Sequence, residues 1–523
     1  MKRRPLIFWL LLAVAIAATI WWALHVPRDP RALYRAIPAN ATWLSVHSNL
    51  AARWPDLAAN PLLTSVAGAL GIETKDWADQ STSAGTTEFL NRLARDELCI
   101  AYVPEMRMTG RPAWVFSSWL GGGSQRFRWT LKSIKDPTLR RAASRNGWSV
   151  WVWTPKGMKS GERITFALVE GMLVGCIAAD TLGIEDVLAC YDGHIPSVAQ
   201  QHDLMLPPPA SRPDRGWLRI PQSYGWGPPI RYSFTVQPGG ALAGTVLTEG
   251  GAIESRPPVP ANELDDFSRL MRDHPVGALV LDRSLAQRWV RQSFRNPVGR
   301  EIARLLEGDG PGSAAVALVG GPYSGRFMAV RLPTLLAAIS SADPAQSARR
   351  LGDAFDRLNS AFPWGLVPQP VTVGTQRVFA IESTGRSPYA SLDSAERVAY
   401  VPLQQNLVFS SNLETLIKLL RESGAPAETP GRFETSLRRM REGAALGYLW
   451  MDLDDGAKLL RLAVTAWSLK LLVEDPQGSQ PMRQRLNEVK AWIDTLAPLR
   501  TLQIWVRPQQ DQLEYEFQLG GDS

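Results

Sequence analysis

The chain is poor in the residues that most often carry chemistry. Its 523 residues include only three cysteines and five histidines. Cys99, Cys176 and Cys190 cannot, by number or spacing, form a disulfide scaffold or a cysteine metal site. A single disulfide between Cys176 and Cys190 is one alternative in an oxidising compartment. We favour the other, in which all three are small buried apolar side chains.

The sequence also lacks the short motifs of the common enzyme classes. It contains no Gly-x-Ser-x-Gly, no His-Glu-x-x-His, no Walker loop and no dinucleotide fingerprint. The triple glycine at 121–123 has no Gly-Lys-Ser/Thr after it, so it indicates a flexible turn rather than a phosphate loop. We therefore expect no catalytic residue, metal or cofactor, and an enzyme is the less favoured interpretation.

Four of the five histidines have positions that do not favour a site. His25 adjoins an apolar segment, His274 precedes a proline, and His194 and His202 are too far apart for a helical metal pair. His47 alone lies on a predicted strand. A polar strand end explains His47 structurally, and we prefer that explanation to a catalytic role.

Positive charge is in slight excess and is dispersed. The formal net charge is +7, of which Lys2, Arg3 and Arg4 supply three charges ahead of an apolar segment. Elsewhere acidic residues are interleaved with basic pairs such as Arg140 and Arg141. There is no basic stripe of the kind that nucleic acid requires, so no nucleic-acid partner is expected.

One long apolar run lies near the N-terminus. Pro5 to Leu24 contains 20 residues without a charge, enough for a helix to cross a hydrocarbon core of roughly 30 Å. The preceding basic residues predict a cytoplasmic N-terminus and a periplasmic remainder, as in a single-pass protein of the bacterial inner membrane. A signal peptide cleaved after Ala17 is the alternative. Because the apolar run continues for seven residues past Ala17, we prefer an uncleaved anchor.

Two stretches of the remaining chain resemble each other. In Asn40–Pro61 and Pro275–Pro297 an apolar run ends on a polar residue, a helix-capping residue follows, and then come Leu-Ala-x-Arg-Trp and Asn-Pro. Each copy predicts a strand, an N-cap (Asn49 or Ser284) and an amphipathic helix. A fainter third copy occurs at 447–457. The polar residues at the strand ends, His47, Asp282 and Asp452, are therefore our candidates for a polar site.

The later elements follow the same order in both halves. Asp136-Pro137 and Asp343-Pro344 each predict the start of a helix, and Asp180 and Asn412 each predict a helix cap. Strands are predicted at 97–103, 113–120, 148–153, 164–177, 230–236 and 242–247 in the first half. The matching strands of the second half are predicted at 313–319, 326–332, 378–382, 398–410, 502–506 and 513–519.

This order predicts an α+β fold with two similar units after an N-terminal transmembrane helix. Each unit is expected to be a mainly antiparallel sheet with helices packed on one face. The predicted ranges are 1–27 for the anchor, 28–39 for a tether, 40–250 for unit one, 251–274 for a linker and 275–521 for unit two. Unit two carries an extra helical insertion at 455–496, which indicates either a cover for its own sheet or a docking surface, and we prefer the cover.

Tryptophan is abundant, and two tryptophans are candidates for an aromatic binding surface. Trp151 and Trp153 share one face of a predicted strand. An aromatic platform for sugar rings is one interpretation in an envelope protein. Burial beneath a neighbouring helix is the interpretation we prefer, because large aromatics commonly fill such cores.

The general plan resembles that of a group of uncharacterised bacterial envelope proteins whose exported region is a domain of unknown function. The resemblance rests on the anchor, the short tether and units that open with Pro-x-x-Ala-x-x-apolar-x-Val, followed by a Leu-Ala helix. It implies a location and a fold type, and it implies no reaction.

Two functions remain as hypotheses. The first is a membrane-tethered periplasmic scaffold or binding module, which contacts the membrane through its anchor and has an envelope protein as partner. The second is an envelope hydrolase, or a protein that handles lipid or another hydrophobic ligand, with its site between the two units.

The anchor generates a direct prediction. A reporter that is active only outside the cytoplasm, fused after Gly521, should give signal in cells whose membrane fraction retains the full-length protein. Recovery of a soluble, shortened species would show instead that the segment is cleaved.

Overall fold

In the computed structural model the chain divides into two compact units, which are Met1–Gly240 with Gly244–Thr248, and Ala241–Ala243 with Glu249–Ser523. The structure describes most residues from Asp29 to Gly520. Outside the description are gaps of one to four residues and the ranges 1–28, 65–95, 155–160, 207–211, 250–264, 386–396, 423–444, 475–485, 491–499 and 521–523. The predicted anchor Pro5–Leu24 lies in this part. Among the described residues, no helix has the length and apolar character needed to cross a membrane.

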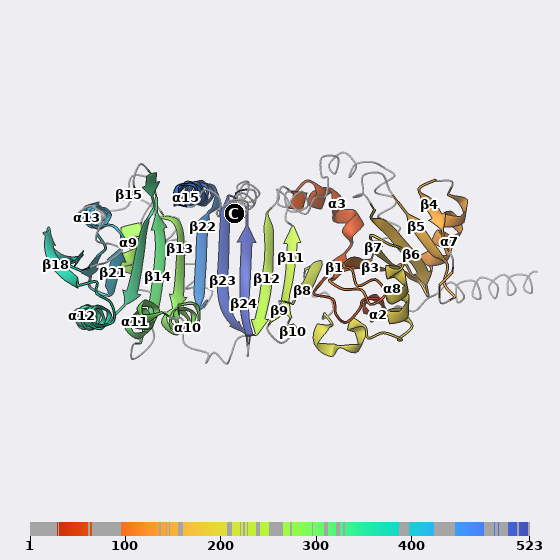
Figure 1. The fold of residues 1–523 in the computed structure, drawn as a ribbon, viewed down its shortest axis with the longest axis horizontal. Helices are drawn as coiled ribbons and strands as arrows, with labels where there is room; N and C mark the ends of the chain where they lie inside the picture. Colours follow the sequence, from red (N-terminus) through yellow and green to blue (C-terminus); the bar gives the residue numbers. More distant parts are fainter. Residues whose placement is uncertain are drawn as a thin grey trace, which may run out of the picture. The chain divides into compact units, whose positions relative to one another are not determined.

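The first unit contains one antiparallel sheet with the strand order β4-β5-β6-β7-β3-β2-β1-β8-β11 (Figure 1). These strands are β1 (Trp43–Ser48), β2 (Glu97–Val103), β3 (Ala113–Trp119), β4 (Leu139–Arg141), β5 (Val150–Trp153), β6 (Arg163–Val169), β7 (Met172–Ala178), β8 (Asp214–Leu218) and β11 (Ile230–Val236). A small hairpin of β9 (Pro221–Gln222) and β10 (Gly225–Trp226) follows β8, and β12 (Leu242–Glu249) follows β11.

The second unit repeats this order. Its antiparallel sheet runs β18-β19-β20-β21-β17-β14-β13-β22-β23-β24 (Figure 1). These strands are β13 (Pro275–Asp282), β14 (Ser313–Val319), β17 (Thr334–Ser340), β18 (Leu366–Val373), β19 (Gln376–Ser383), β20 (Ala399–Pro402), β21 (Asn406–Ser410), β22 (Gly447–Asp452), β23 (Thr501–Gln509) and β24 (Gln512–Leu519). The predicted α+β class and antiparallel sheets are thus confirmed.

Helices lie on both faces of each sheet, so the prediction of helices on one face is wrong. The first face packs against α2 (Ala32–Arg35) and α8 (Gly183–Tyr191) in unit 1, and against α9 (Asp265–Met271) and α13 (Leu413–Glu422) in unit 2. The second face packs against α3 (Leu50–Ala58) and α7 (Gly123–Ser133) in unit 1, and against α10 (Arg283–Ser293), α11 (Pro297–Leu305) and α12 (Pro344–Ala361) in unit 2.

The physical reason is visible in strand β6. Ala167 and Val169 pack in the core of the first face, whereas Phe166 and Leu168 pack with Phe127 of α7 on the second. A strand that is apolar on both sides must be covered on both sides. The sheets are therefore middle layers, as the continuous apolar run in β6 implies.

The same second-face cluster decides the question of the two strand tryptophans. Trp151 and Trp153 are partly buried and pack against the cluster that contains Phe127 and Leu131 of α7. The prediction of burial beneath a helix is confirmed, and the sugar-platform interpretation is not supported at this position.

The β6–β7 hairpin forms where it was predicted. Glu170 has a φ of 44° and Gly171 a φ of 86°, which are the left-handed conformations that a tight two-residue hairpin turn requires. The Gly171 carbonyl accepts hydrogen bonds from the backbone N–H groups of Leu120 and Gly121 at 2.9 Å. The turn therefore also fixes the point at which the chain leaves β3.

Two predicted elements near these strands are wrong. The helix predicted to start at Asp136-Pro137 is not found among the described residues that follow, where β4 lies, and the helix of this region is α7, which begins earlier, at Gly123 in the triple glycine; Asp136 itself lies outside the described residues. The counterpart of β3 is β17, not the strand expected at 326–332. Residues of that range form β15 (Gly325–Phe327) and β16 (Val330–Leu332), a separate two-stranded sheet.

The sheet register corrects the predicted pairing of His47 with Asp282. His47 lies opposite Leu98, and Leu281 lies opposite Ala314. Leu98 packs with α3, and Leu281 and Ala314 pack with α10, so His47 corresponds to Leu281. Three positions separate His47 from Leu50 of the Leu-Ala-x-Arg-Trp motif, whereas four separate Leu281 from Leu285, so the connection in unit 2 is one residue longer and shifts the match by one position.

Other predicted caps are confirmed. Asp180 accepts from the backbone N–H of Leu182 at 2.9 Å, and Asn412 accepts from that of Thr415 at 2.8 Å. Asp343 accepts from the backbone N–H of Gln346 at 3.0 Å. Asn49 accepts no capping hydrogen bond, so its predicted role is wrong.

The predicted insertion of unit 2 begins with a long helix, α15 (Leu453–Glu474). This helix contacts β13, β22 and β23. The first half of the predicted insertion is thus a helix against its own sheet, and nearly all of the second half lies outside the described residues.

A glycine in the first sheet provides a test of the packing. A Cβ atom at Gly216 would overlap with the carbonyl oxygen of Leu44 and the hydroxyl of Tyr232. Gly216→Ala should therefore destabilise the protein by about 1–3 kcal/mol in urea unfolding. Gly352 lies inside α12 with nothing within 4 Å of such a Cβ, so Gly352→Ala should instead be neutral or stabilising by up to about 1 kcal/mol. Equal effects of the two substitutions would contradict this packing.

Candidate functional site

The three polar candidates lie in two different units and at different strand ends. His47 belongs to unit 1, whereas Asp282 and Asp452 belong to unit 2. Within unit 2, β13 and β22 are antiparallel neighbours, with Gly277 opposite Met451 and Leu281 opposite Gly447. The C-terminal residues of these strands, Asp282 and Asp452, therefore lie at opposite ends of the sheet.

Asp282 and Asp452 each cap a helix. Asp282 accepts from the backbone N–H of Ser284 at 2.9 Å at the start of α10. Asp452 accepts from the backbone N–H groups of Asp454 and Asp455, both at 3.0 Å, at the start of α15. Each carboxylate satisfies free N–H groups and faces the positive end of a helix dipole. The predicted cap of α10, Ser284, lies two residues after the observed cap.

His47 belongs to a charged cluster that the sequence did not reveal. Its Nδ1 lies 2.8 Å from Oδ1 of Asp214, the residue opposite His47 on the neighbouring strand β8. Arg53 of α3 donates to both carboxylate oxygens of Asp214, from Nη1 at 2.6 Å and from Nη2 at 2.7 Å. Asp214 is fully buried.

Burial alone would raise the pKa of the Asp214 carboxyl. The hydrogen bonds and charges of Arg53 and His47 outweigh that effect and hold the pKa below its usual value. The group is therefore a carboxylate throughout the neutral range, and it is paired on both oxygens.

This cluster fastens α3 to the sheet. Arg53 also donates from Nε and Nη2 to the backbone carbonyl of Ser48, at 3.1 and 2.8 Å. One guanidinium thus joins the helix to the end of β1 and to β8. In unit 2 the position of His47 holds Leu281 and that of Asp214 holds Gly447, so the same place is apolar. The hydrogen bonds of Arg53 to Asp214 and Ser48 are those of a structural clamp.

The cysteines are buried and form no disulfide. Burial raises the pKa of the Cys99, Cys176 and Cys190 thiols to about 12 in each case. Each therefore remains a thiol near neutral pH, which agrees with the preferred interpretation as small buried side chains. The structure also shows no group of three or more His, Cys, Asp or Glu side chains placed to hold a metal ion in the described part of the chain.

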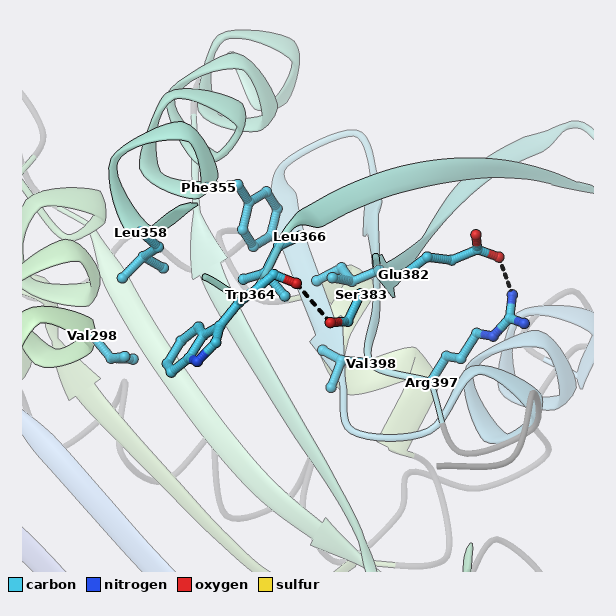
Figure 2. A pocket seen from close by; sticks show the side chains of 10 residues that line it. Val298, Phe355, Leu358, Trp364, Leu366, Glu382, Ser383, Arg397 and Val398 are labelled. Atoms are coloured by element: carbon cyan, nitrogen blue, oxygen red, sulfur yellow. Dashed lines mark hydrogen bonds and ion pairs between the residues drawn. The ribbon is translucent and has the colours of Figure 1, made fainter. Parts of the chain in front are cut away.

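A cavity of about 380 Å³ lies in unit 2, in a region that sequence reasoning did not single out. Its lining is mostly apolar and comes from α11, α12, the α12–β18 turn, β18, β19 and the residues before β20. The lining residues are Val298, Phe355, Leu358, Trp364, Leu366, Ile381, Glu382, Ser383, Arg397 and Val398. In Figure 2 the Trp364 ring points toward Val298 and Leu358, while Glu382 and Arg397 form an ion pair at the other end.

Polar side chains hold the walls of this cavity in place. Asn359 of α12 bonds both backbone groups of Leu366, donating to its carbonyl at 2.9 Å and accepting from its N–H at 2.7 Å. Ser383 donates to the carbonyl of Trp364 at 2.7 Å (Figure 2). The buried Glu301 of α11 pairs with Arg357 of α12 at 2.8 Å. The cavity is therefore lined by elements that are bonded to one another.

The arrangement suits binding. The apolar lining favours a hydrocarbon or aromatic group, and the Glu382–Arg397 pair and Ser383 offer polar contacts at one side. Sequence reasoning missed the cavity because its residues come from five separate segments. The one local signal is Phe362-Pro-Trp364-Gly, in which the two aromatic rings stack with centroids 4.3 Å apart.

Comparison with known proteins assigns this chain to no family. No family model, no curated protein and no solved structure matches this chain. The resemblance to uncharacterised envelope proteins therefore remains an interpretation of the sequence pattern.

The Asp214 clamp generates a pH prediction. Asp214→Asn should destabilise the protein by about 2–4 kcal/mol at pH 7, because it leaves Arg53 without its buried partner. The carboxyl has a lowered pKa in the folded protein, so its stabilising effect is complete above its unfolded pKa of about 3.9. That effect is lost as pH falls through the lower folded pKa. Urea unfolding from pH 7 to pH 3 should show the difference between wild type and variant narrowing below about pH 4.

The matched control is Asp29→Asn, which removes an exposed pair with Arg35. This substitution should cost less than about 1 kcal/mol. A difference at Asp214 that stays constant down to pH 3 would contradict the role of its charge.

Proposed function

We propose that this protein is a membrane-tethered binding module of the bacterial periplasm, built from two copies of one α+β unit. Its ligand is a small amphipathic molecule, with the apolar part inside the unit-2 cavity and the polar part beside Glu382 and Arg397. The cavity is the observation that carries the proposal.

The size and lining of the cavity support this choice. A volume of about 380 Å³ is within the range of small-molecule sites, which are mostly apolar with a few placed polar groups. The hydrogen bonds of Asn359 and Ser383 hold the surrounding turn before any ligand arrives. Preorganisation of this kind lowers the entropic cost of binding.

The duplication is supported by the strand orders of the two sheets. Across the sheet of unit 2, the strands from β18 to β23 have the same order as their counterparts β4-β5-β6-β7-β3-β2-β1-β8-β11 in unit 1. Along the chain, β24 follows β23 as β12 follows β11. The large tryptophans of β8 and β22, Trp217 and Trp450, occupy equivalent register positions and are both buried in the first-face core. Equivalent burial at equivalent register is what common descent of the units would leave.

The second hypothesis from the sequence contained two alternatives, hydrolysis and the handling of a hydrophobic ligand. The apolar lining of the cavity favours the handling of a hydrophobic ligand. Pro5–Leu24 and the preceding basic residues support the proposed tether, with the binding module on the periplasmic side of the inner membrane.

Filling the cavity tests the proposal. Binding of 8-anilinonaphthalene-1-sulfonate, which has an apolar aromatic body and one anionic sulfonate, to the full chain in detergent should be measured by fluorescence titration. Val298→Trp places a large ring at the cavity wall and should weaken this binding at least tenfold.

The matched control is Val367→Trp. Val367 follows the cavity-lining Leu366 on β18, points to the opposite side of the strand and is exposed. It should leave binding unchanged. Equal binding by wild type and both variants would show that the cavity is not the site of the probe and would overturn the proposal.

A further inference from the structure

The positive charge of the chain is not evenly dispersed, contrary to the expectation from the sequence. Residues 121–161 contain nine Lys and Arg residues and one acidic residue, Asp136, so their net charge of +8 exceeds the +7 of the whole chain. This stretch includes α7 and the strands β4 and β5, which lie at one edge of the unit-1 sheet (Figure 1). Unit 1 therefore has one strongly basic edge.

Helix α7 packs its apolar side against the sheet and carries a tryptophan on its outer side. Phe127 and Leu131 are buried in the second-face cluster. Trp129 is 68% exposed, the largest fraction among the exposed large apolar side chains of the described residues. Because an α-helix has about 3.6 residues per turn, Trp129 lies on the side of α7 opposite Phe127 and Leu131. Its indole therefore cannot pack against the sheet that α7 covers.

Cations flank this indole. Arg126 and Lys132, three residues before and three residues after Trp129, lie on the same outer side and are exposed. We call Arg126, Trp129 and Lys132 the α7 surface. Arg141 of β4 lies on the same face of the sheet as Leu139, which packs in the α7 cluster, and it donates to the hydroxyl of Ser149 at 2.8 Å.

These cations are not neutralised within the described part of the chain. None of the described carboxylates forms an ion pair with Arg126, Lys132 or Arg141. Of the two acidic residues that flank β6, Glu162 takes part in no such pair and Glu170 accepts from the hydroxyl of Tyr191 at 3.2 Å. The charge of the α7 surface is thus available to an anionic partner.

The α7 surface suits a lipid bilayer better than a protein. The centre of a protein interface is apolar and depleted in charge, whereas here one indole projects between cations. Tryptophan is enriched at the headgroup level of membranes, and lysine and arginine are attracted to anionic headgroups at the same level. Ile134, the 42% exposed C-cap residue of α7, offers a second apolar side chain to the bilayer.

We propose that the α7 surface of unit 1 binds an anionic lipid bilayer. The Trp129 indole inserts among the headgroups, while Arg126, Lys132 and Arg141 face the lipid phosphates. Phe127 and Leu131 stay in the core, so α7 does not have to leave the sheet. Binding of this kind holds unit 1 against the membrane surface, and it does not involve the ligand cavity of unit 2.

Unit 1 is kept near the bilayer by the membrane tether, and in this respect the inference rests on the proposed function. Residues 25–31 separate Leu24, at the end of the predicted anchor, from Ala32, at the start of α2. Such a segment spans at most about 25 Å when extended. A tether of this length raises the effective concentration of the surface at the bilayer, so a weak contact suffices.

Lipid quenching of a fluorophore on α7 tests the proposal. Gln125 is exposed on the outer side of α7, and the three native cysteines are buried, so Gln125→Cys can be labelled selectively with nitrobenzoxadiazole. The full chain is inserted through its anchor into nanodiscs with a spin label at the lipid headgroups. Discs with about 30% phosphatidylglycerol should quench the label at least fivefold more than discs of phosphatidylcholine alone.

Two variants of the labelled chain test the residues. Arg126→Glu with Lys132→Glu should reduce quenching to the level of the phosphatidylcholine discs, and Trp129→Ser should reduce it at least threefold. Raising the salt to about 0.5 M NaCl should also weaken quenching, because the charges are exposed. Circular dichroism of each variant establishes that it is folded.

The matched control is Arg107→Glu with Arg111→Glu. It makes the same change in net charge at exposed arginines of the β2–β3 loop. That loop packs toward the first face, where the backbone N–H of Met108 donates to Asp186 of α8 at 3.0 Å. Quenching of the α7 label should be unchanged in this variant.

Several results would overturn the proposal. These are equal quenching in the two kinds of disc, equal loss in the α7 variant and the loop control, and loss of quenching on addition of soluble DNA or acidic polysaccharide at equal charge. Failure of the tether is seen separately, as full chain that does not enter phosphatidylcholine discs. The same chain should then still sediment with phosphatidylglycerol vesicles in a manner that depends on Arg126 and Lys132, and absence of that binding would also overturn the proposal.

Discussion

Each sheet of this protein must bury both of its faces, and the remaining architecture follows from that constraint. The strands nearest the middle carry apolar side chains on both sides, as Leu168 and Val169 of β6 show by packing in different clusters. Antiparallel sheets often leave one face to water, but these strands do not allow it. Helices before, between and after the strands supply the two covers, so each unit is a three-layer structure.

A few charged side chains are buried among the apolar side chains of unit 1, and each of them is paired. Glu97 and Arg215 form an ion pair at 2.9 Å on the first face, with both side chains almost fully buried. By register, unit 2 has Ser313 and Tyr448 at these positions. Such a pair adds little net stability because desolvation offsets attraction, but removal of one partner is costly. Unit 1 is therefore the copy in which charge, at Asp214 and at Arg215, constrains how the layers meet.

Much of the fold could be predicted from sequence, because alternation and turn residues are local properties. The strand 97–103 and the turn at Glu170-Gly171 were predicted at their observed positions. Errors arose where a pattern fits two structures. Asp-Pro is typical of turns as well as of helix starts, and the run 334–340 has apolar spacing that also fits a helix. The register error came from the connection between strand and helix, which is one residue longer from Leu281 to Leu285 than from His47 to Leu50, a difference that the matched motif does not reveal.

The candidate sites were harder to predict than the fold. His47 was identified, but Asp214 lies 167 positions away and becomes its partner only through the β1–β8 register. The cavity residues likewise come together only after α11, α12, β18 and β19 have packed. Sequence distance hides such contacts because a sheet joins strands that the chain separates.

The location of the cavity follows from the way in which the two units differ. Helix α12 has 18 residues and β18 has eight, whereas their counterparts in unit 1, α7 and β4, have 11 and three. The longer pair extends beyond the part of the sheet that the shared core fills. Trp364 closes the turn between α12 and β18, and Val298 of α11 supplies the opposite wall. A cavity forms there because the longer α12 and β18 enclose more space than their side chains fill. Unit 1, with short versions of both elements, packs Phe127 and Leu131 of α7 directly against the sheet.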